Sequence, residues 1–365
     1  MSQAPFNKPR SPSRSGKRSN GVRSHPFDQW PEADRLAWST ACRPGERLKR
    51  GGPASHMKEN TRNDLARRYG YFLDYVQRTE GLDPNAGPTA YVTPERVDGY
   101  LAELQARVRS VTVYGSIYKL RRTAELLNPG ADLAWLREIE DDLALVMQPR
   151  SKFNRFVDTN VLVDAAMELM AKADAATKQS PLARARQFRD GLMVALEALH
   201  PIRLKNFVAL EIGRSFKKVN GTWWILLSAS ETKEGRADER PIVAYLSRWI
   251  DRYLSEHRPV LARTQDPPPS LWLSSNDGKP LSYSAVEKIF SRTTKALVGI
   301  DINPHLFRTA GVSTAAMYAG DRPHLGSALL HHTDPSVAEE HYNRAAGLSA
   351  AKSYGDLIRS LRRRD

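Results

Sequence analysis

Apolar residues recur at spacings of three and four along much of the first half of this chain, and no other pattern in it restricts the fold more. That period matches an α-helix that buries one face. It predicts a helix that carries Leu65 to Val76, a second that starts at Thr93-Pro94, a third that starts at Ser110, and a fourth through Leu133 to Leu143. A hydroxyl cap and a first-turn proline favour the start at Thr93. We therefore expect a compact helical domain over residues 57–148.

A basic linker over residues 149–157 is predicted next, and beyond it the sequence mixes helical and strand-like patterns. Asn220-Gly221 stands between two runs of apolar and aromatic residues, which is typical of a type I′ hairpin. Further strands are predicted at 208–212 and 240–243, and helices at 158–175, 181–199, 246–256, 284–298, 305–319 and 322–331. The fold class is thus mainly α with a small antiparallel β-sheet (α+β), with a second domain over 158–346.

Both ends of the chain differ from these two domains. Residues 1–55 are rich in Ser, Pro, Arg, Lys and Gly, which predicts a mostly disordered basic arm that either contacts the DNA backbone or is simply solvated. Trp30 and Trp38 indicate that part of 27–42 docks on the protein. In the tail over 347–365, apolar residues at helical spacing predict a helix that packs on a neighbouring protomer or on its own domain.

The charge of the chain favours a polyanionic partner, although a basic protein of unrelated function would share it. Lys and Arg number 55 against 41 Asp and Glu, a net charge of +14. The single cysteine, Cys42, excludes an intramolecular disulfide and a thiolate-rich zinc site. No apolar run approaches the roughly 18 residues of a membrane helix, and the N-terminus lacks the apolar segment of a secretory signal. We therefore expect a cytoplasmic protein with no membrane partner.

The last quarter of the chain carries a group of residues suited to phosphate chemistry. His305-Leu306-Phe307-Arg308 is followed by Leu330-His331-His332 and then by Tyr342. One arginine side chain can bind two phosphate oxygens at once. Histidine can transfer protons near neutral pH, and a deprotonated tyrosine can attack phosphorus. Several histidines fall in this region, but none has the spacing of a metal site. A surface ion pair is the ordinary alternative for His305 and Arg308.

Two basic residues upstream extend this group. Arg203 is flanked by apolar residues, so its guanidinium requires a buried partner, either a carboxylate such as Glu211 or a bound phosphate. Lys233 lies in a polar stretch between two predicted strands, where it either reaches a cleft and protonates a leaving oxygen or is an ordinary surface lysine.

The ordered set Arg203, Lys233, His305, Arg308, His332 and Tyr342, which follows a helical domain, resembles the tyrosine recombinase (phage integrase) family over roughly residues 60–350. The resemblance implies a helical core-binding domain and a catalytic domain that close around DNA as a C-shaped clamp. The sequence departs from the family at three places. His200-Pro201-Ile202-Arg203 replaces Thr-Gly-Leu/Met-Arg, Asn206 replaces a glutamate, and His331 replaces a glycine, so we take His332 as the functional histidine.

The resemblance also implies a mechanism. Tyr342 would attack the scissile phosphate and form a 3′-phosphotyrosyl link, while Arg203 and Arg308 would bind the non-bridging oxygens. Lys233 would be the general acid for the leaving 5′-oxygen, His305 would act on the tyrosine as base or orienting group, and His332 would donate a hydrogen bond to the phosphate. No cofactor is expected, since exchange of one phosphoester for another requires neither ATP nor metal.

The implied partners are double-stranded DNA with inverted-repeat core sites and three further copies of the chain, as a homotetramer on two duplexes. The expected role is integration or excision of a mobile element, with a small accessory directionality factor and association with the nucleoid when DNA is bound. Candidate DNA contacts, each of which is equally well an ordinary solvated residue, are Arg107, Arg109, Lys119, Arg121, Arg122 and Lys152.

Four alternatives remain open at this point. Two use related chemistry: a chromosome dimer resolvase, and an enzyme like a type IB topoisomerase or a hairpin telomere resolvase. The others are a DNA-binding regulator without catalysis and a general basic nucleic-acid-binding protein, whose affinity for DNA would not depend on sequence.

Overall fold

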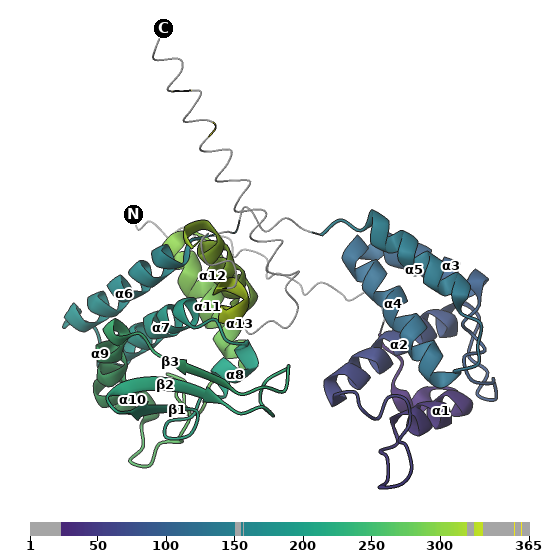
Figure 1. Ribbon diagram of the computed structural model, residues 1–365, viewed down its shortest axis with the longest axis horizontal. Coiled ribbons are helices and arrows are strands. Elements are labelled where there is room, and N and C mark those ends of the chain that lie inside the picture. The colour runs from purple at the N-terminus through teal and green to yellow at the C-terminus, as the bar shows by residue number, and fades with distance from the viewer. Residues whose placement is uncertain are drawn as a thin grey trace, which may run out of the picture. The chain divides into compact units, whose positions relative to one another are not determined.

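The computed structural model describes residues 23–149, 155, 157–319, 325–330, 354 and 359. The chain divides into two compact units, Met1–Arg150 and Ser151–Asp365. Figure 1 shows the helices and strands of each unit, and each unit has its own hydrophobic core. None of the described helices is both long and apolar enough to cross a membrane.

The regular elements of the first unit are all helical among its described residues, and turns and loops connect them. Its elements are η1 (Phe27–Gln29), α1 (Glu32–Cys42), α2 (Glu59–Thr79), α3 (Pro94–Arg107), α4 (Ser110–Leu127) and α5 (Ala134–Val146). The Thr93 side chain caps α3 by accepting a hydrogen bond from the Arg96 amide, and Pro94 occupies the first turn. The helical pattern read over 57–148 is therefore confirmed, with small shifts at the helix ends.

The predicted disorder of residues 1–55 is wrong from residue 23 onward, while residues 1–22 lie outside the described part of the chain. Trp30 and Trp38 are buried, and the Trp30 ring meets the Tyr69 ring edge to face at 4.9 Å. Asp34, fully buried on α1, accepts hydrogen bonds from the Tyr69 hydroxyl and the Thr89 amide, both at 2.8 Å. The average composition of this segment resembles that of a disordered chain. The buried rings of Trp30 and Trp38 and the hydrogen-bonded carboxylate of Asp34 nevertheless hold it against the helical unit.

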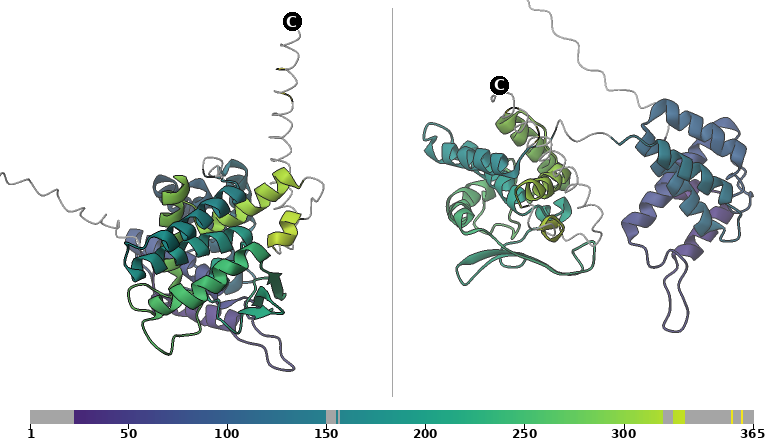
Figure 2. Two further views of the ribbon diagram at one scale, coloured as in Figure 1. Left: turned by 90° about the vertical axis from the view of Figure 1, so that its left-hand side faces the viewer. Right: turned by 45° about the horizontal axis from the view of Figure 1, so that its top comes forward.

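The second unit is built around α7 (Figures 1 and 2), which is buried along most of its length. Helices α6, α11 and α12 pack on it. Its helical elements are α6 (Thr159–Ala175), α7 (Pro181–Leu199), α8 (Leu204–Val208), α9 (Ala244–Arg252), the π-helical turn η3 (Tyr253–His257), α10 (Arg258–Ala262), α11 (Tyr283–Val298), α12 (Pro304–Tyr318) and α13 (Leu325–Leu330).

A three-stranded antiparallel sheet completes this unit, in the order β1 (Phe216–Val219), β2 (Thr222–Leu227) and β3 (Asp238–Pro241). Asn220 and Gly221 have φ of 49° and 81°, as the two central residues of a type I′ turn require. The hairpin prediction is confirmed, and β3 begins two residues earlier than predicted. The fold class, mainly α with a small antiparallel sheet, is confirmed as well.

The strand predicted at 208–212 is wrong. The chain forms the short helix α8 over Leu204–Val208, and Glu211 makes only an isolated bridge to Ser270. Leu204 and Phe207 are both buried, three residues apart, which is a helical spacing. A short apolar run does not by itself distinguish a buried helical turn from a buried strand.

We expect Trp30→Ala to lower the free energy of unfolding of the helical unit by ~3–5 kcal/mol, the usual effect of emptying a buried tryptophan site. Leu36→Ala, on the same segment but with a side chain 62% exposed, is the matched control and should change stability little. Hydrogen exchange of the α2 amides in the full-length protein under increasing urea measures both effects. Equal, small effects would mean that the segment is not part of the core.

Candidate active site

The guanidinium of Arg308 is the best-anchored group in the candidate site. Asn303 caps α12 by accepting a hydrogen bond from the Leu306 amide, which places Arg308 in the first turns of the helix. Its Nη1 donates to the Pro201 carbonyl at 2.6 Å, and its Nη2 donates to the Leu330 carbonyl at 3.1 Å. One side chain therefore joins α12, the turn that follows α7, and the end of α13.

Close packing supports the same junction. Gly311 lies one turn after Arg308 on α12, and a Cβ atom there would stand 3.1 Å from Leu329 Cδ2 and 3.4 Å from Pro201 Cγ. An extra carbon would require the end of the Leu329 side chain to give by a few tenths of an ångström, and it would be in ordinary contact with Pro201. The absence of a side chain at Gly311 thus lets α12, α13 and the Pro201 turn come together.

Arg308 keeps its charge at neutral pH in spite of its surroundings. Burial lowers the pKa of Arg308 to about 10, with a further contribution from the positive charge of Arg203. Glu197 and Glu234 oppose this shift. Two like charges close together repel each other, and an anion between them would relieve that repulsion.

Arg203 is oriented by the connection between β2 and β3. It occupies the N-cap position of α8, is partly exposed, and forms an ion pair with Glu234. Burial alone would raise the pKa of Glu234, but the hydrogen bond and the charge of Arg203 lower it on balance. Glu211, the carboxylate considered from the sequence, instead pairs with Arg214 at 2.5 Å.

Lys233 directly precedes Glu234 and is exposed. The Thr232 hydroxyl organises this connection, since it donates to the Arg236 carbonyl at 2.7 Å and accepts from the Arg236 amide at 3.1 Å. The ion pair between Arg203 and Glu234 therefore ties the segment that carries Lys233 to the first arginine.

His305 lies in the first turn of α12, three residues before Arg308, and is exposed. The structure thus brings Arg203 and Arg308 near each other, and His305 lies on the same helix as Arg308. His331, His332 and Tyr342 lie outside the described residues. The Leu330 carbonyl that Arg308 holds is two residues before His332 in the chain.

A buried layer of charged groups, not anticipated from the sequence, lies near the arginines. Arg240 makes a two-point ion pair with Asp238 at 2.7 and 2.8 Å, with both side chains buried. Glu197, on α7, is fully buried, and its two carboxylate oxygens have no hydrogen-bond partner among the described residues. Burial raises the pKa of Glu197 well above its usual range, although Arg308 and Arg240 oppose the rise.

His200 is a second buried titratable side chain in this layer, and burial disfavours its charged form as it does that of Glu197. Burial and the charge of Arg240 lower the pKa of His200 to about 4, and Asp238 opposes the shift. Glu197 and His200 therefore both favour their uncharged forms, so Glu197 does not cancel the positive charge of Arg308. The only sequence sign of this layer is a glutamate in the otherwise apolar end of the 181–199 helix.

Three of the predicted DNA contacts form close ion pairs within the helical unit, Arg121 with Glu140, Arg122 with Glu125, and Lys119 with Asp64, and Arg107 makes a longer one of 3.8 Å to Glu103. The side chain of Arg121 is only 7% exposed, so it belongs to the interior of the unit. Arg122 and Lys119 are partly exposed.

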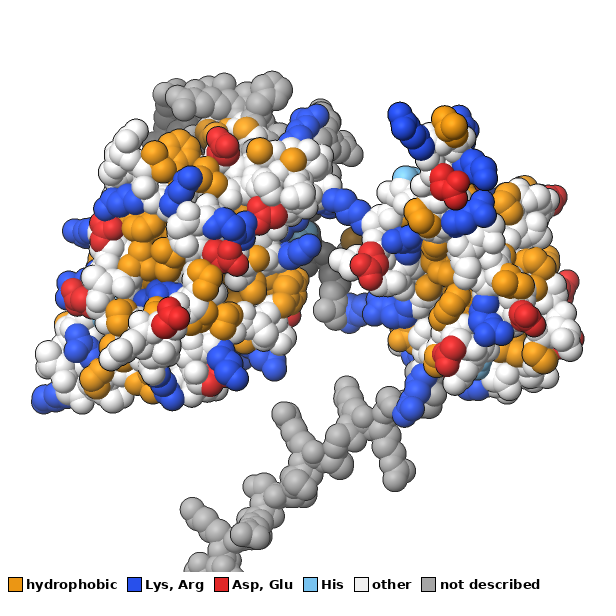
Figure 3. Space-filling view, turned by 90° about the horizontal axis from the view of Figure 1, so that it is seen from below, with side chains coloured by type: hydrophobic (Ala, Val, Ile, Leu, Met, Phe, Trp, Pro, Cys, Tyr) orange, Lys and Arg blue, Asp and Glu red, His pale blue; other side chains and the backbone are white. Residues whose placement is uncertain are grey.

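The other predicted contacts lie nearer to solvent. Arg107 and Arg109 are exposed, and Lys152 lies outside the described residues. On the visible face of each unit, basic side chains are spread out and not gathered into one patch (Figure 3). On this face, general charge alone therefore does not single out a DNA-binding surface.

We expect Glu197→Gln to stabilise the protein increasingly as the pH rises. A carboxyl whose pKa is raised by folding stabilises the native state fully only below its unfolded value near 4.5, and that contribution is lost as the pH climbs toward the folded value. Glutamine has no proton to lose. Thermal unfolding of both proteins from pH 5 to pH 8 should show a difference that widens with pH. Glu168→Gln, with a side chain 65% exposed, is the control, and a parallel pH profile for both variants would contradict the account.

Comparison with known proteins places this geometry in a family. Residues 161–347, about half of the chain, match the model of the phage integrase family. No curated protein matches the chain by sequence. A crystal structure of the XerH site-specific recombinase bound to its difH substrate in a pre-cleavage complex superposes with a TM-score of 0.51 at 15% identity, covering 80% of this chain and 78% of that one.

Two further structures match with lower scores. XerH with a palindromic difH substrate, in a post-cleavage complex, has a TM-score of 0.47 at 14% identity and covers 91% of this chain and 99% of that one. The XerA recombinase has a TM-score of 0.38 at 14% identity, with coverages of 82% and 94%. The matched region contains Arg203, Lys233, His305, Arg308, His332 and Tyr342. The chain belongs to the phage integrase family, the tyrosine recombinases.

Proposed function

We propose that this protein is a site-specific DNA recombinase that cuts and rejoins strands through a 3′-phosphotyrosyl link to Tyr342. The observation that carries the proposal is the pair of guanidiniums, Arg203 and Arg308, anchored close to each other within the region that matches the family. Membership of the family supports site-specific recombination as the activity.

The arginines would act on the charge of the reacting phosphate. As the tyrosine oxygen bonds to phosphorus, negative charge builds up on the non-bridging oxygens, and fixed cations stabilise that state more than the ground state. Arg308 is held in place by two carbonyls, so little reorganisation is needed during the reaction. Arg203 would exchange its contact with Glu234 for one with the phosphate.

The remaining groups would move protons. Tyr342 gives up its proton as its oxygen bonds to phosphorus, with His305 as the base or orienting group. The bond to the 5′-oxygen breaks, and Lys233 protonates that oxygen. His332 donates a hydrogen bond to the phosphate. Since one phosphoester replaces another, the step needs neither ATP nor a metal, and attack by the 5′-hydroxyl of a partner strand reverses it.

The proposed assembly is a homotetramer that holds two duplexes at inverted-repeat sites, in the cytoplasm and at the nucleoid. The proposed role is integration or excision of a mobile element with an accessory directionality factor. The departures from the family motif at Pro201 and His331 support a specialised member. The Pro201 turn still supplies what Arg308 needs, because the accepting atom is a backbone carbonyl.

Tyr342→Phe should abolish covalent capture of DNA, because phenylalanine has no oxygen to attack phosphorus. A duplex that carries the recombination site, nicked next to the scissile phosphate, should trap a denaturant-stable adduct with the wild-type protein. The adduct should map to Tyr342 by peptide sequencing. Capture that persists in Tyr342→Phe would contradict the assigned nucleophile, and joining of two separate duplexes would distinguish recombination from relaxation.

Arg308→Lys should slow adduct formation by roughly 10²–10³-fold, the usual effect of losing one preorganised donor to a developing anion. A lysine keeps the charge but cannot span two carbonyls and a phosphate in one fixed fork. Arg263→Lys is a matched control, because Arg263 also donates to two carbonyls, those of Ser275 and Asn276, but lies on the exposed surface. Single-turnover cleavage at saturating protein measures both, and equal rates would contradict the role of Arg308.

A further inference from the structure

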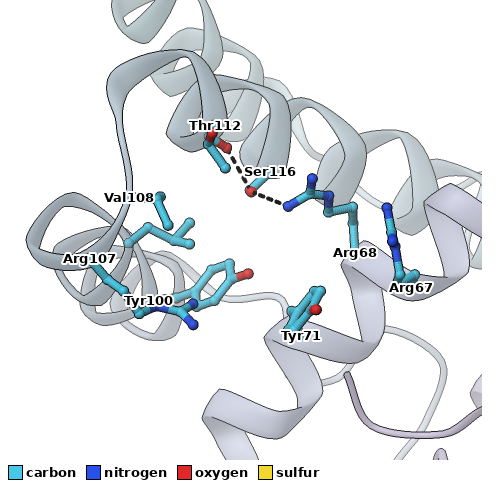
Figure 4. Close-up of a pocket in the computed structure, with 9 residues that line it drawn as sticks. Arg67, Arg68, Tyr71, Tyr100, Arg107, Val108, Thr112 and Ser116 are labelled. Atoms are coloured by element: carbon cyan, nitrogen blue, oxygen red, sulfur yellow. Dashed lines mark hydrogen bonds between the residues drawn. The ribbon is translucent and has the colours of Figure 1, made fainter. Parts of the chain in front are cut away.

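The helical unit contains a pocket of about 230 Å³ that the active site does not use (Figure 4). It lies between α2, α3 and α4. Three arginines line it, Arg67 and Arg68 from α2 and Arg107 from α3. The hydroxyl-bearing residues of its lining are Tyr71, Tyr100, Thr112 and Ser116. No carboxylate of the described residues belongs to its lining.

Arg68 is the least satisfied of these cations. Its Nη1 donates to the Ser116 hydroxyl in a long hydrogen bond of 3.4 Å, and Ser116 donates in turn to the Thr112 carbonyl at 2.7 Å. Within the described part of the chain, the buried Nε of Arg68 has no hydrogen-bond partner. A buried guanidinium N–H without an acceptor is costly, so Arg68 has hydrogen-bonding capacity that the described residues leave unused.

The other two arginines are only partly neutralised, and from outside the pocket. Arg67 pairs with Asp64 at 2.9 Å, while Arg107 reaches Glu103 at a longer 3.8 Å. Arg107 and Arg68 both stand close enough to Tyr100 to oppose the rise that burial causes in the pKa of its hydroxyl. Arg68 and Arg107 therefore line the same pocket, Arg68 directed toward Ser116 and Arg107 beside Tyr100 (Figure 4).

We propose that this pocket binds a single phosphate group through Arg68 and Arg107. Guanidinium forks and hydroxyl donors are the groups that recognise phosphate oxygens, and nothing in the lining would hold a cation. The volume is below the roughly 300–1,000 Å³ of pockets for whole small molecules, so it suits one phosphate better than a complete nucleotide.

Two sources can supply this chemistry: a phosphodiester of the DNA backbone, or the phosphate of a free small molecule. The first source rests on the proposed function, whereas the second does not. A backbone phosphate seated here would fix the position of the helical unit on DNA without reading its sequence.

The test uses the full-length protein with Arg68→Lys, Arg68→Gln and Arg107→Gln. Arg137→Gln, an exposed arginine of α5 outside the pocket lining, is the control for simple loss of charge. Thermal unfolding verifies that each variant folds, and Arg107→Gln keeps the test valid if a substitution at Arg68 disturbs packing.

Titration with inorganic phosphate, followed by the side-chain Nε–H resonance of Arg68, reports on the pocket directly. A saturable shift that is absent in Arg107→Gln supports the site. In parallel, affinity for a short mixed-sequence duplex is measured against salt concentration. If the DNA backbone is the source, Arg68→Gln and Arg68→Lys should each weaken binding about tenfold. Arg68→Gln should also reduce the salt slope by about one, whereas Arg137→Gln should change affinity much less.

A phosphate-induced shift together with DNA affinities equal to that of the control would assign the pocket to a free phosphate compound. No shift with phosphate, together with equal affinities for all variants, would overturn the proposal. The adduct assay at Tyr342 separates this result from the proposed function. The proposed phosphate binding can be disproved while wild-type protein still traps DNA. Conversely, the recombinase assignment can be disproved while the Arg68 resonance still shifts with phosphate.

Discussion

The two hydrogen bonds from Arg308 to the carbonyls of Pro201 and Leu330 are the contact on which the candidate active site depends. They join a helix, a turn and the end of a second helix that are far apart in the sequence. The close approach at Gly311 makes the same junction tight. Because the acceptors are backbone atoms, this contact survives changes of side chain in the Pro201 turn, where the sequence departs from its family.

Charge is balanced around this contact so that the site stays positive. Glu197 is a buried carboxyl whose oxygens have no hydrogen-bond partner among the described residues, and burial favours its protonated form. Asp238 forms an ion pair with Arg240. Glu234, in the connection between β2 and β3, forms an ion pair with Arg203. Arg308 and Arg203 therefore keep net attraction for an anion, and the anion that the family chemistry requires is a phosphate in DNA.

Much of this could be predicted from the sequence, because local patterns encode local structure. Helical periodicity, the cap at Thr93 and the Asn220-Gly221 turn depend on neighbouring residues and were read correctly. The strand prediction at 208–212 is wrong, because a short apolar segment is compatible with either a helix or a strand. Trp30 and Trp38 indicate from the sequence that their segment docks, but the ring that Trp30 meets and the carbonyl acceptors of Arg308 depend on tertiary contacts, and backbone acceptors have no residue type to reveal them.

The central claim is that Arg308 neutralises charge on the scissile phosphate, and a substrate with a neutral phosphate tests it most directly. In a methylphosphonate linkage, one non-bridging oxygen is replaced by a methyl group and the negative charge is gone. The account predicts that Arg308→Ala cleaves normal DNA much more slowly than the wild type does. On the methylphosphonate substrate its rate should approach that of the wild type, because the negative charge that Arg308 stabilises is absent. An undiminished difference between Arg308→Ala and wild type on the neutral substrate would contradict it.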